Sequence, residues 1–345
     1  MLSIVANAQS TAPSPATRPA AQPAAQEGAA HASQGAVAPD AFAQIKRLGR
    51  GTNILGYDPI WSDASKGRFQ EKHFKLLAQA GFNHVRVDLQ AFAFMDRNNQ
   101  LSPAWFNRLD WVVKHARANG LAVIIDQHNF VEMGNEGAAL YPKLVAFWKQ
   151  VAPHLKDASS DVFFEILNEP NGKVTPEIWN QYLVECLGII RETNPTRTVI
   201  VGPANWNAIG FLDKLQLPEN DRNLIVTVHY YAPMEFTHQG AYWAKEYTKL
   251  SGITWGTEAE KLKVLEDFKV ADAWGRAHRR PLFLGEFGAY DKAAMPDRVR
   301  YTAHVARTAE SLGWAWSYWQ FDSDFILYDI DKDHWTEPIL KALIP

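Results

Sequence analysis

From Asp40 to the C-terminus, short apolar runs alternate with amphipathic stretches that are long enough to form helices. The amphipathic residues 70–81 carry Phe74, Leu77 and Ala78 on one helical face, and a second helix is predicted from Pro176 to the region of Asn194. The apolar runs have the length and composition of buried strands. We predict eight strands, over residues 48–54, 82–89, 121–128, 162–169, 198–203, 224–231, 281–288 and 313–321.

The regular succession of strand and helix predicts the fold class. Eight strand–helix units within about 300 residues are typical of a closed barrel rather than of a doubly wound sheet. We therefore predict an α/β fold of the (β/α)8, or TIM barrel, type, formed as a single domain by residues 41–345. The short last unit, residues 335–345 (WTEPILKALIP), is expected to close the ring.

The first 40 residues differ in composition from the rest. Residues 10–40 consist mainly of Ala, Pro, Gln, Ser and Thr, which cannot bury enough surface to fold, so we predict a low-complexity linker or arm. Residues 1–9 contain Ala6-Asn7-Ala8, a small-residue site of the type that signal peptidase cleaves, although no basic residue precedes it. We interpret residues 1–9 as the remnant of a signal peptide and expect an exported protein, secreted or periplasmic.

Charge and cysteine content exclude several classes of partner. With 35 basic and 38 acidic residues and a net charge of -3, neither nucleic acid nor a membrane surface is expected as a partner. The single cysteine, Cys186, lies on a helical pattern and is expected to be an inert core thiol. No cofactor is expected. The glycine-flanked motif GEFG at residues 285–288 does not indicate a phosphate site, because its glutamate would repel the anion.

Polar side chains gather toward the carboxyl ends of the predicted strands. In residues 82–89, Val85 and Val87 alternate with Arg86 and Asp88. The outer face of a barrel strand lies under apolar helices, so we expect the polar set to point inward. In barrel enzymes the active site lies at the carboxyl ends of the strands. The polar residues there are Asp126, His128, Asn168, Glu169, His229, Tyr231, Glu286, Trp319 and Gln320.

Two of these residues are glutamates on different sides of the predicted barrel mouth. Glu169 ends the fourth strand and Glu286 lies in the seventh. Such a pair can cleave a glycosidic bond, because one carboxylic acid protonates the leaving oxygen while the other attacks the anomeric carbon or activates water. Glu165 has the same inward direction as Glu169 but should lie about 13 Å deeper, at about 3.3 Å per residue. We expect Glu165 to be structural and to pair with Arg86 or His84.

The order of these residues resembles glycoside hydrolase family 5, the cellulase family in the clan of retaining barrel glycosidases. In that family an Arg lies in strand two, a His ends strand three, Asn-Glu-Pro ends strand four, His-x-Tyr ends strand six, a Glu lies in strand seven and a Trp in strand eight. This sequence supplies Arg86, His128, Asn168-Glu169-Pro170, His229, Tyr231, Glu286 and Trp319. The tripeptide alone is a weak signal, whereas the ordered set over about residues 41–345 is a strong one.

The resemblance implies catalytic roles. Glu169 would be the general acid/base, with its pKa held up by the negative charge of Glu286, and Glu286 would be the nucleophile. Arg86 and the Tyr231 hydroxyl would keep Glu286 ionised. His229 would support both carboxylates.

The resemblance also implies substrate contacts. Asn168 would bind the sugar 2-hydroxyl, although strict alternation points it outward, so a bulge or the strand end must re-aim it. His128 would hold the sugar, and Trp319 would form the floor beneath it. Trp206 and Trp61, in loops after the predicted fifth and first strands, would contact further sugar units, as could Trp243 and Trp255.

The expected partner is a polysaccharide, a β-glucan. Flat tryptophan faces suit an equatorial β-glucan chain, so we expect an endo-acting β-1,4-glucanase, a cellulase. Members of the family also cut mannan, xyloglucan and mixed-linkage glucans with the same carboxylates. A β-mannanase or a xyloglucan- or mixed-linkage glucanase therefore remains an alternative.

Two other classes of protein can be weighed against a glycosidase. A metal-dependent barrel hydrolase would draw ligands from Asp126, His128, His229 and Glu286. Such barrels usually carry His-x-His in the first strand, where this chain has RGTNI, and no metal is expected. A catalytically inactive sugar-binding barrel would have lost a carboxylate, whereas both are present.

Overall fold

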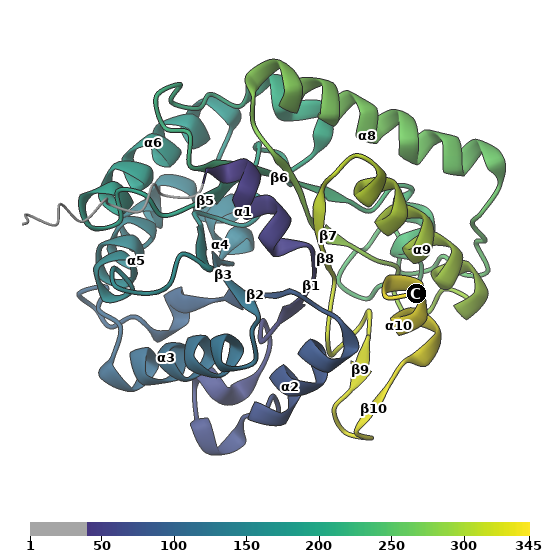
Figure 1. Cartoon of the computed structure of the whole chain (residues 1–345), viewed down its shortest axis with the longest axis horizontal. Coiled ribbons are helices and arrows are strands. Elements are labelled where there is room, and N and C mark those ends of the chain that lie inside the picture. The colour runs from purple at the N-terminus through teal and green to yellow at the C-terminus, as the bar shows by residue number, and fades with distance from the viewer. Residues whose placement is uncertain (1–39) are drawn as a thin grey trace, which may run out of the picture. The chain divides into compact units, whose positions relative to one another are not determined.

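The structure, a computed structural model, describes residues 40–345, in which eight strands form one closed barrel (Figure 1). Neighbouring strands are parallel and pair in chain order, and β1 pairs with β8 to close the ring. The strands are β1 (Arg50–Ile54), β2 (His84–Leu89), β3 (Ala122–Gln127), β4 (Val162–Glu165), β5 (Val199–Val201), β6 (Leu224–Tyr230), β7 (Leu282–Phe287) and β8 (Ala315–Tyr318). The predicted (β/α)8 barrel is thus confirmed. The predictions for residues 1–9 and 10–39 fall outside the described residues.

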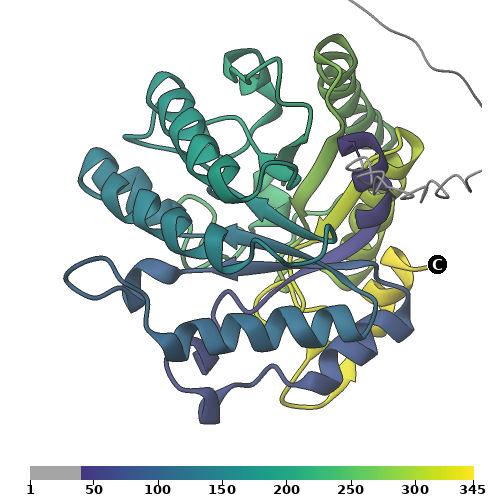
Figure 2. The same ribbon diagram turned by 60° about the vertical axis from the view of Figure 1, so that its left-hand side comes forward.

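Helices surround the barrel and cover the outer face of the strands (Figure 2). α6 begins at Pro176, whose preceding residue Thr175 caps the helix by accepting from the Ile178 amide. The helices are α1 (Ala41–Leu48), α2 (Glu71–Ala80), α3 (Pro103–Ala118), α4 (Phe130–Glu136), α5 (Tyr141–His154), α6 (Pro176–Thr193), α7 (Met234–Thr237), α8 (Glu258–His278), α9 (Met295–Ser311) and α10 (Glu337–Leu343). Both predicted helices are present, as α2 and α6.

The interior of the barrel is filled from one end by α1. Its apolar face, Ala41, Ile45 and Leu48, belongs to one buried cluster with inward-facing residues from the first halves of the strands, such as Ile225 and Phe283. Asp40 caps α1 by accepting a hydrogen bond from the Ala43 amide at 2.8 Å. Because this end is apolar and closed, polar chemistry is confined to the opposite, carboxyl end of the barrel.

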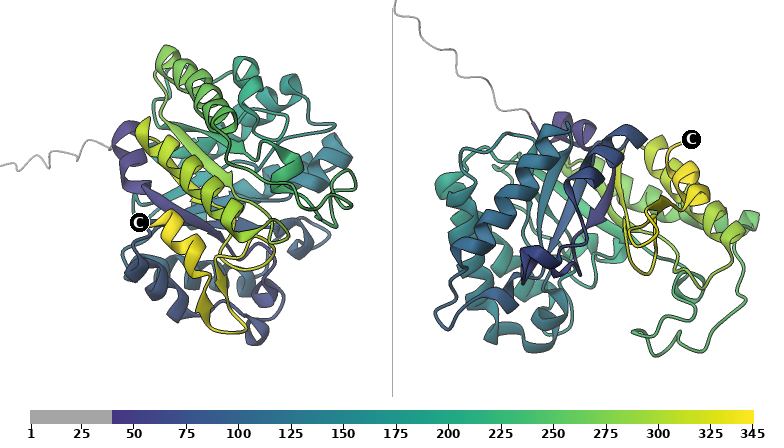
Figure 3. Two further views of the ribbon diagram at one scale, coloured as in Figure 1. Left: turned by 90° about the vertical axis from the view of Figure 1, so that its right-hand side faces the viewer. Right: turned by 90° about the horizontal axis from the view of Figure 1, so that it is seen from below.

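The last segment of the chain completes the outer layer beside α9. Two short strands, β9 (Tyr328–Asp329) and β10 (His334–Trp335), form an antiparallel ribbon, and α10 then packs against α9 (Figure 3). Cys186 is buried in α6, as expected of a core thiol. Among residues 40–345, no helix is both long and apolar enough to cross a membrane.

Candidate active site

The carboxyl ends of the strands bring the predicted site residues together. Each catalytic candidate lies on a strand or on the residues that directly follow one, and Tyr231 is partly exposed. The remaining candidates are almost completely buried: Arg86, His128, Asn168, Glu169, His229, Glu286 and Trp319.

The guanidinium of Arg86 is the centre of the site. Its Nε and Nη2 donate to the two carboxylate oxygens of Glu165, at 2.7 and 2.8 Å. Its Nη1 donates to Glu286 and to Asn53, each at 2.8 Å, and its Nη2 also donates to Asn168 at 2.7 Å. An arginine has five N–H donors, so all of them are used.

The position of Glu165 differs from the expectation. β4 ends at Glu165, four residues earlier than predicted, so a rise of about 3.3 Å per residue does not apply between Glu165 and Glu169. One guanidinium contacts both Glu165 and Glu286, which places Glu165 directly beneath the site rather than far below it. The predicted pairing of Glu165 with Arg86 is present, whereas His84 contacts the Leu48 carbonyl through Nδ1 at 2.7 Å.

The early end of β4 also re-aims Asn168. Beyond Glu165 the chain leaves regular strand geometry, and Glu169 has a positive φ of 41°. Asn168 and Glu169 are therefore both buried at the carboxyl end of the barrel, although they are adjacent in the sequence. Strict strand alternation would have turned one of them outward.

Glu286 is held by two donors. Arg86 Nη1 donates to Oε1 at 2.8 Å, and the Tyr231 hydroxyl donates to Oε2 at 3.0 Å. Burial raises the pKa of Glu286, while the neighbouring His229 and Arg86 lower it. Hydrogen bonds to both oxygens favour the carboxylate, the form that a nucleophile requires.

A β-bulge directs Glu286 into the barrel. The pairing of β6 with β7 shifts register between Val228 and His229, so that Gly285 is the extra residue and His229 lies opposite Glu286. A Cβ atom on Gly285 would lie 2.4 Å from Thr227 Oγ1 and 2.8 Å from His229 Nε2. Only glycine fits this position without displacing its neighbours.

Glu169 is in a different electrostatic environment. Its Oε1 lies 2.6 Å from Nδ1 of His229. Burial raises the pKa of Glu169 to about 8, and the charges of Asp126 and Glu165 contribute to the rise against the opposing effect of Arg86. At neutral pH Glu169 is therefore mainly protonated, as a general acid must be.

The separation of the two carboxylates indicates the stereochemical course that they can support. One oxygen of Glu169, one oxygen of Glu286 and a ring nitrogen of His229 all lie within 4.8 Å of one another. Carboxyl groups about 5 Å apart are typical of retaining glycosidases, because inverting enzymes need about 6.5–9.5 Å to admit a water molecule. The arrangement therefore suits a covalent mechanism.

His128 contacts both the ring of Trp319 and the buried carboxylate of Asp126. Its ring stacks on Trp319 with 5.5 Å between the ring centroids, and its Nδ1 lies 2.5 Å from Asp126 Oδ2. Burial lowers the pKa of His128 to about 3, so the imidazole is neutral. Nε2 of His128 lies 3.4 Å from Nδ2 of Asn168, which joins His128 to the Arg86 network.

Within residues 40–345, two groups of residues have the composition of a metal site. Besides Glu169, His229 and Glu286, oxygen or nitrogen atoms of Asp88, Asp126 and His128 lie within 4.8 Å of one another. In each group the histidine Nδ1 already contacts a carboxylate. Arg86 lies 2.8 Å from Glu286 and 3.1 Å from Asp126, so a fixed cation already faces both groups. The donors fit an ion-pair network better than a metal centre.

Comparison with known proteins decides the family. The model of the family described as Cellulase (glycosyl hydrolase family 5) matches residues 46–324. This chain belongs to glycoside hydrolase family 5. The family assignment made from the ordered residue set is thus confirmed.

Relatives of this family-5 chain are known by sequence and by structure. It is 30% identical to Endoglucanase H of Acetivibrio thermocellus over 89% of the chain, and 26% identical to Endoglucanase 3 of Fibrobacter succinogenes over 87% of the chain. The chain spans only 34% and 53% of the lengths of these two relatives. Thermotoga maritima Cel5A, solved in complex with mannotriose and with cellobiose, is 38% identical with a TM-score of 0.84, and the match covers 88% of this chain and 100% of that one.

The structure corrects two of the four predicted contacts of loop tryptophans with sugar. Trp61 is only 4% exposed, donates from Nε1 to the Leu55 carbonyl at 3.1 Å and packs on Trp105, so it is a core residue rather than a sugar platform. Trp255 is likewise buried. In contrast, Trp206 is 48% exposed and Trp243 is 43% exposed. The loop position of a tryptophan in the sequence does not distinguish these two outcomes.

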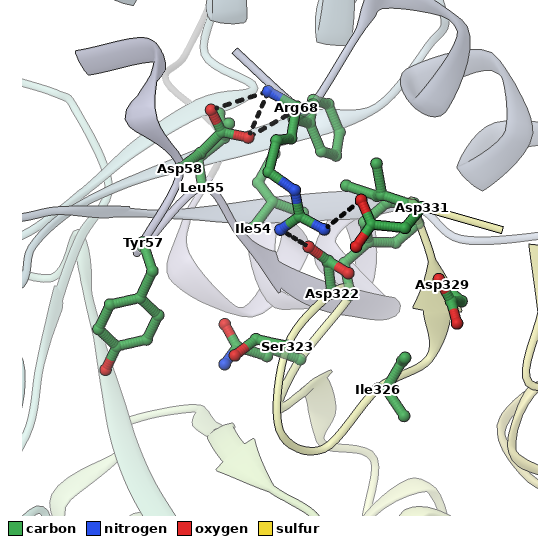
Figure 4. Close-up of a pocket in the computed structure, with 15 residues that line it drawn as sticks. Ile54, Leu55, Tyr57, Asp58, Arg68, Asp322, Ser323, Ile326, Asp329 and Asp331 are labelled. Atoms are coloured by element: carbon green, nitrogen blue, oxygen red, sulfur yellow. Dashed lines mark hydrogen bonds and ion pairs between the residues drawn. The ribbon is translucent and has the colours of Figure 1, made fainter. Parts of the chain in front are cut away.

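A hollow of about 290 Å³ lies between the loops that follow β1 and β8 (Figure 4). Gln320, the residue after Trp319, lines it. Tyr57 also lines it and is 61% exposed. Burial raises the pKa of Tyr57, and the charges of Asp88 and Glu286 add to the rise. Among the residues that line the hollow, Arg68 forms ion pairs with Asp322 at 2.6 Å and Asp331 at 3.2 Å.

Two residues of the site were missed by sequence reasoning. Asn53 in β1 accepts from Arg86 and donates to the Gly285 carbonyl at 3.2 Å, so it supports the bulge. Nδ2 of Asn207 lies 3.2 Å from Nε2 of His229. The inward parity of Asn53 in RGTNI was a usable signal, whereas nothing local marked Asn207, which follows β5 in a loop of positive-φ residues.

Proposed function

We propose that this chain hydrolyses internal β-1,4 linkages of a glucan and retains the anomeric configuration. The observation that carries the proposal is the pair of unlike carboxylates: Glu286 is held ionised by two donors, and Glu169 is held protonated less than 5 Å away. Retaining glycosidases require one carboxyl group of each kind at this spacing.

In the first half of the reaction, an oxygen of Glu286 attacks the anomeric carbon and Glu169 gives its proton to the leaving oxygen. The glycosidic C–O bond breaks and an ester to Glu286 forms. The ester carries no charge, so the pKa of Glu169 falls and the carboxylate that remains becomes a better base. Glu169 then accepts a proton from a water molecule as the water oxygen attacks the anomeric carbon, and the ester C–O bond to Glu286 breaks.

The neighbouring residues support this course. Arg86 and Tyr231 stabilise the negative charge that returns to Glu286 by donating hydrogen bonds to it. Arg86 also donates to Asn168, which places Asn168 near the nucleophile, where it can bind a sugar hydroxyl. Trp319 and His128 form a stacked aromatic surface at the base of the site. The exposed faces of Trp206 and Tyr57 can stack on sugar units farther along the chain.

Glucan is favoured over mannan because the curated relatives are named endoglucanases. The mannotriose complex of Cel5A makes mannan the appropriate comparison substrate. From the sequence of residues 1–9 we also propose that the protein is exported. Mature protein isolated from the native host should begin near Gln9, and a chain that keeps Met1 would contradict export.

Reducing-end release from soluble β-1,4-glucan and β-mannan at equal concentration tests the activity. We expect faster release from glucan, with a loss of viscosity that runs ahead of reducing-end formation, and a loss of roughly a thousandfold or more in Glu286→Gln. Azide should restore turnover of an activated aryl glycoside to Glu286→Ala with formation of the α-glycosyl azide, and to Glu169→Ala with the β-azide. The opposite products would exchange the two roles, and faster cleavage of mannan would overturn the choice of substrate.

A further inference from the structure

Asp88 is a fully buried carboxylate beside the catalytic network. It lies in β2, two residues after Arg86, and is 0% exposed. Neither of its oxygens has a hydrogen-bond partner among residues 40–345. Gly56, in the loop after β1, covers it, since a Cβ atom on Gly56 would lie 3.3 Å from Asp88 Oδ2.

Arg86 cannot supply the missing hydrogen bond. Its Nη1 lies 3.5 Å from Asp88 Oδ1, but the five N–H donors of Arg86 are used by Glu165, Glu286, Asn53 and Asn168. An ionised carboxylate without a donor in a closed site is strongly unfavourable. The chain must therefore neutralise Asp88 in another way.

The other charged groups around Asp88 increase this requirement. Asp126 from β3 lies within 4.8 Å of Asp88, and the charges of Glu286 from β7 and Glu165 from β4 act on Asp88 together with that of Arg86. Burial and the charge of Asp88 in turn raise the pKa of Tyr57, in the loop after β1. One guanidinium would thus serve four carboxylates if all were ionised. At least one of the four should be neutral.

A bound cation is a poor source of the missing charge. Asp88, Asp126 and His128 together offer few ligand atoms, whereas Ca²⁺ takes six to eight oxygens. His128 Nδ1 already contacts Asp126, and the Arg86 guanidinium lies 3.1 Å from the same carboxylate and would repel a metal ion. A proton on Asp88 needs no further ligand atoms and leaves the side chain uncharged, so neither objection applies to it.

We propose that Asp88 carries a proton in the working enzyme and thereby acts as a positioning residue that keeps Glu286 ionised. The effect on Glu286 as a nucleophile rests on the proposed function, whereas the protonation state of Asp88 does not. A second negative charge beside Arg86 would raise the pKa of Glu286 and favour protonation of the nucleophile. With the proton on Asp88, Arg86 faces three charged carboxylates, Glu165, Glu286 and Asp126, instead of four. Burial raises the pKa of Asp88 well above its usual range, which agrees with this arrangement.

The pH dependence of stability tests the protonation state without an activity assay. A carboxyl group with a raised folded-state pKa takes up a proton on folding, so wild-type stability falls as pH rises from the unfolded pKa, about 3.9, toward the folded pKa. Asp88→Asn keeps the shape of the neutral acid and removes this loss. The Tm of Asp88→Asn relative to wild type should therefore rise between pH 4 and 7, by roughly 2–4 °C per pH unit.

The matched control is Asp157→Asn, because Asp157 is exposed and its variant should show no such slope. Asp88→Asn that is less stable than wild type by the same amount at every pH would overturn the proposal. A rise in the Tm of wild type, but not of Asp88→Asn, on addition of Ca²⁺ or Na⁺ would also overturn it, by identifying a metal ion in place of the proton.

Infrared spectroscopy provides a direct measurement. At pH 7, the wild-type spectrum minus that of Asp88→Asn should contain the carbonyl band of a protonated carboxylic acid, and loss of a carboxylate band instead would contradict the proposal. If Asp88→Asn does not fold, wild type labelled with ¹³C-aspartate replaces it. An acid band that shifts with the label and persists in Asp126→Asn supports a proton on Asp88, and absence of this band overturns it.

Discussion

Nδ1 of His229 lies 2.6 Å from Oε1 of Glu169. The other ring nitrogen, Nε2, accepts from Nδ2 of Asn207 at 3.2 Å, so the hydrogen of the neutral imidazole is on Nδ1 and is donated to Glu169. This bond occupies Oε1 and leaves Oε2 of Glu169 to carry the proton that is transferred to the leaving oxygen. His229 thus determines which oxygen of the general acid faces the substrate.

The pH dependence of kcat/KM should be bell-shaped. Activity requires protonated Glu169 and ionised Glu286, so it should fall on the alkaline side as Glu169 loses its proton near pH 8, and on the acidic side as Glu286 gains one, above the usual carboxylate range. In His229→Phe, Glu169 loses a donor that favours its charged form. Its pKa should then rise, and the alkaline limb should move to higher pH.

Kinetics on a soluble β-1,4-glucan between pH 4 and 10 measure both limbs. His128→Phe is the matched control, because His128 contacts Asp126 instead of Glu169, and its alkaline limb should stay near that of wild type. An alkaline limb that moves to lower pH in His229→Phe would show that His229 does not donate to Glu169.

Arg86→Lys should be severely defective although it preserves the charge. Lysine has three donors on one nitrogen and cannot reproduce the five bonds that Arg86 makes to Glu165, Glu286, Asn53 and Asn168. A buried acceptor left without its donor costs about 1–3 kcal/mol, and at least two acceptors lose theirs, so the free energy of unfolding should fall by about 2–6 kcal/mol. In the folded fraction, kcat should fall at least about a hundredfold, because Glu286 and Asn168 lose their common donor.

Denaturant unfolding and steady-state kinetics on the same samples separate the two effects of Arg86→Lys. Arg47→Lys is the matched control, since Arg47 in α1 is partly exposed and pairs with Asp161 at 3.3 Å, at the end of the barrel opposite the site. Wild-type kcat in Arg86→Lys would mean that the charge alone, without the hydrogen-bond geometry, holds the nucleophile.

The repeating pattern of apolar runs was sufficient to predict the barrel, because all eight strands are buried and each is followed by helical sequence. The residue types at the strand ends then indicated the carboxylates. Strand ends were less predictable: β4 stops at Glu165, since the chain there leaves the ladder to place both Asn168 and Glu169 in the site. Local sequence does not encode that departure, because it depends on Arg86, 82 residues away.

Trp61 and Trp206 show why substrate contacts were harder to predict than catalytic residues. Both follow strands in segments that could be loops, yet one packs on Trp105 and the other is 48% exposed. The difference arises from tertiary packing against α3, which no local pattern reports.

Trp206→Ala should weaken the binding of polysaccharide without altering bond cleavage itself. Loss of one stacking contact is worth about 1 kcal/mol, or about fivefold in KM, with kcat nearly unchanged on a saturating glucan. Trp61→Phe is the matched comparison, because it should lower the free energy of unfolding by about 1–3 kcal/mol and leave KM unchanged. KM on long and short cello-oligosaccharides measures the effect, and an increase for Trp61→Phe alone would restore the original assignment.

Gly285→Ala should damage the catalytic centre through a single methyl group. The added Cβ would lie 2.4 Å from Thr227 Oγ1 and 2.8 Å from His229 Nε2, so either the bulge or His229 must move. A displaced bulge turns Glu286 away from Arg86 and Tyr231, and a displaced His229 releases Glu169. We expect kcat to fall at least about a hundredfold, because misplacement by about 1 Å is enough for such a loss.

A second substitution distinguishes relief of crowding from general damage by Gly285→Ala. Thr227→Ala removes the atom nearest to the new methyl group, and Thr227 Oγ1 has no hydrogen-bond partner among residues 40–345. The double variant Gly285→Ala with Thr227→Ala should therefore recover part of the lost activity, although the contact with His229 remains. Gly188→Ala, in α6, where an added Cβ meets nothing within 4 Å, controls for the glycine change itself. Equal kcat for Gly285→Ala and wild type would show that the bulge can rearrange without moving either carboxylate.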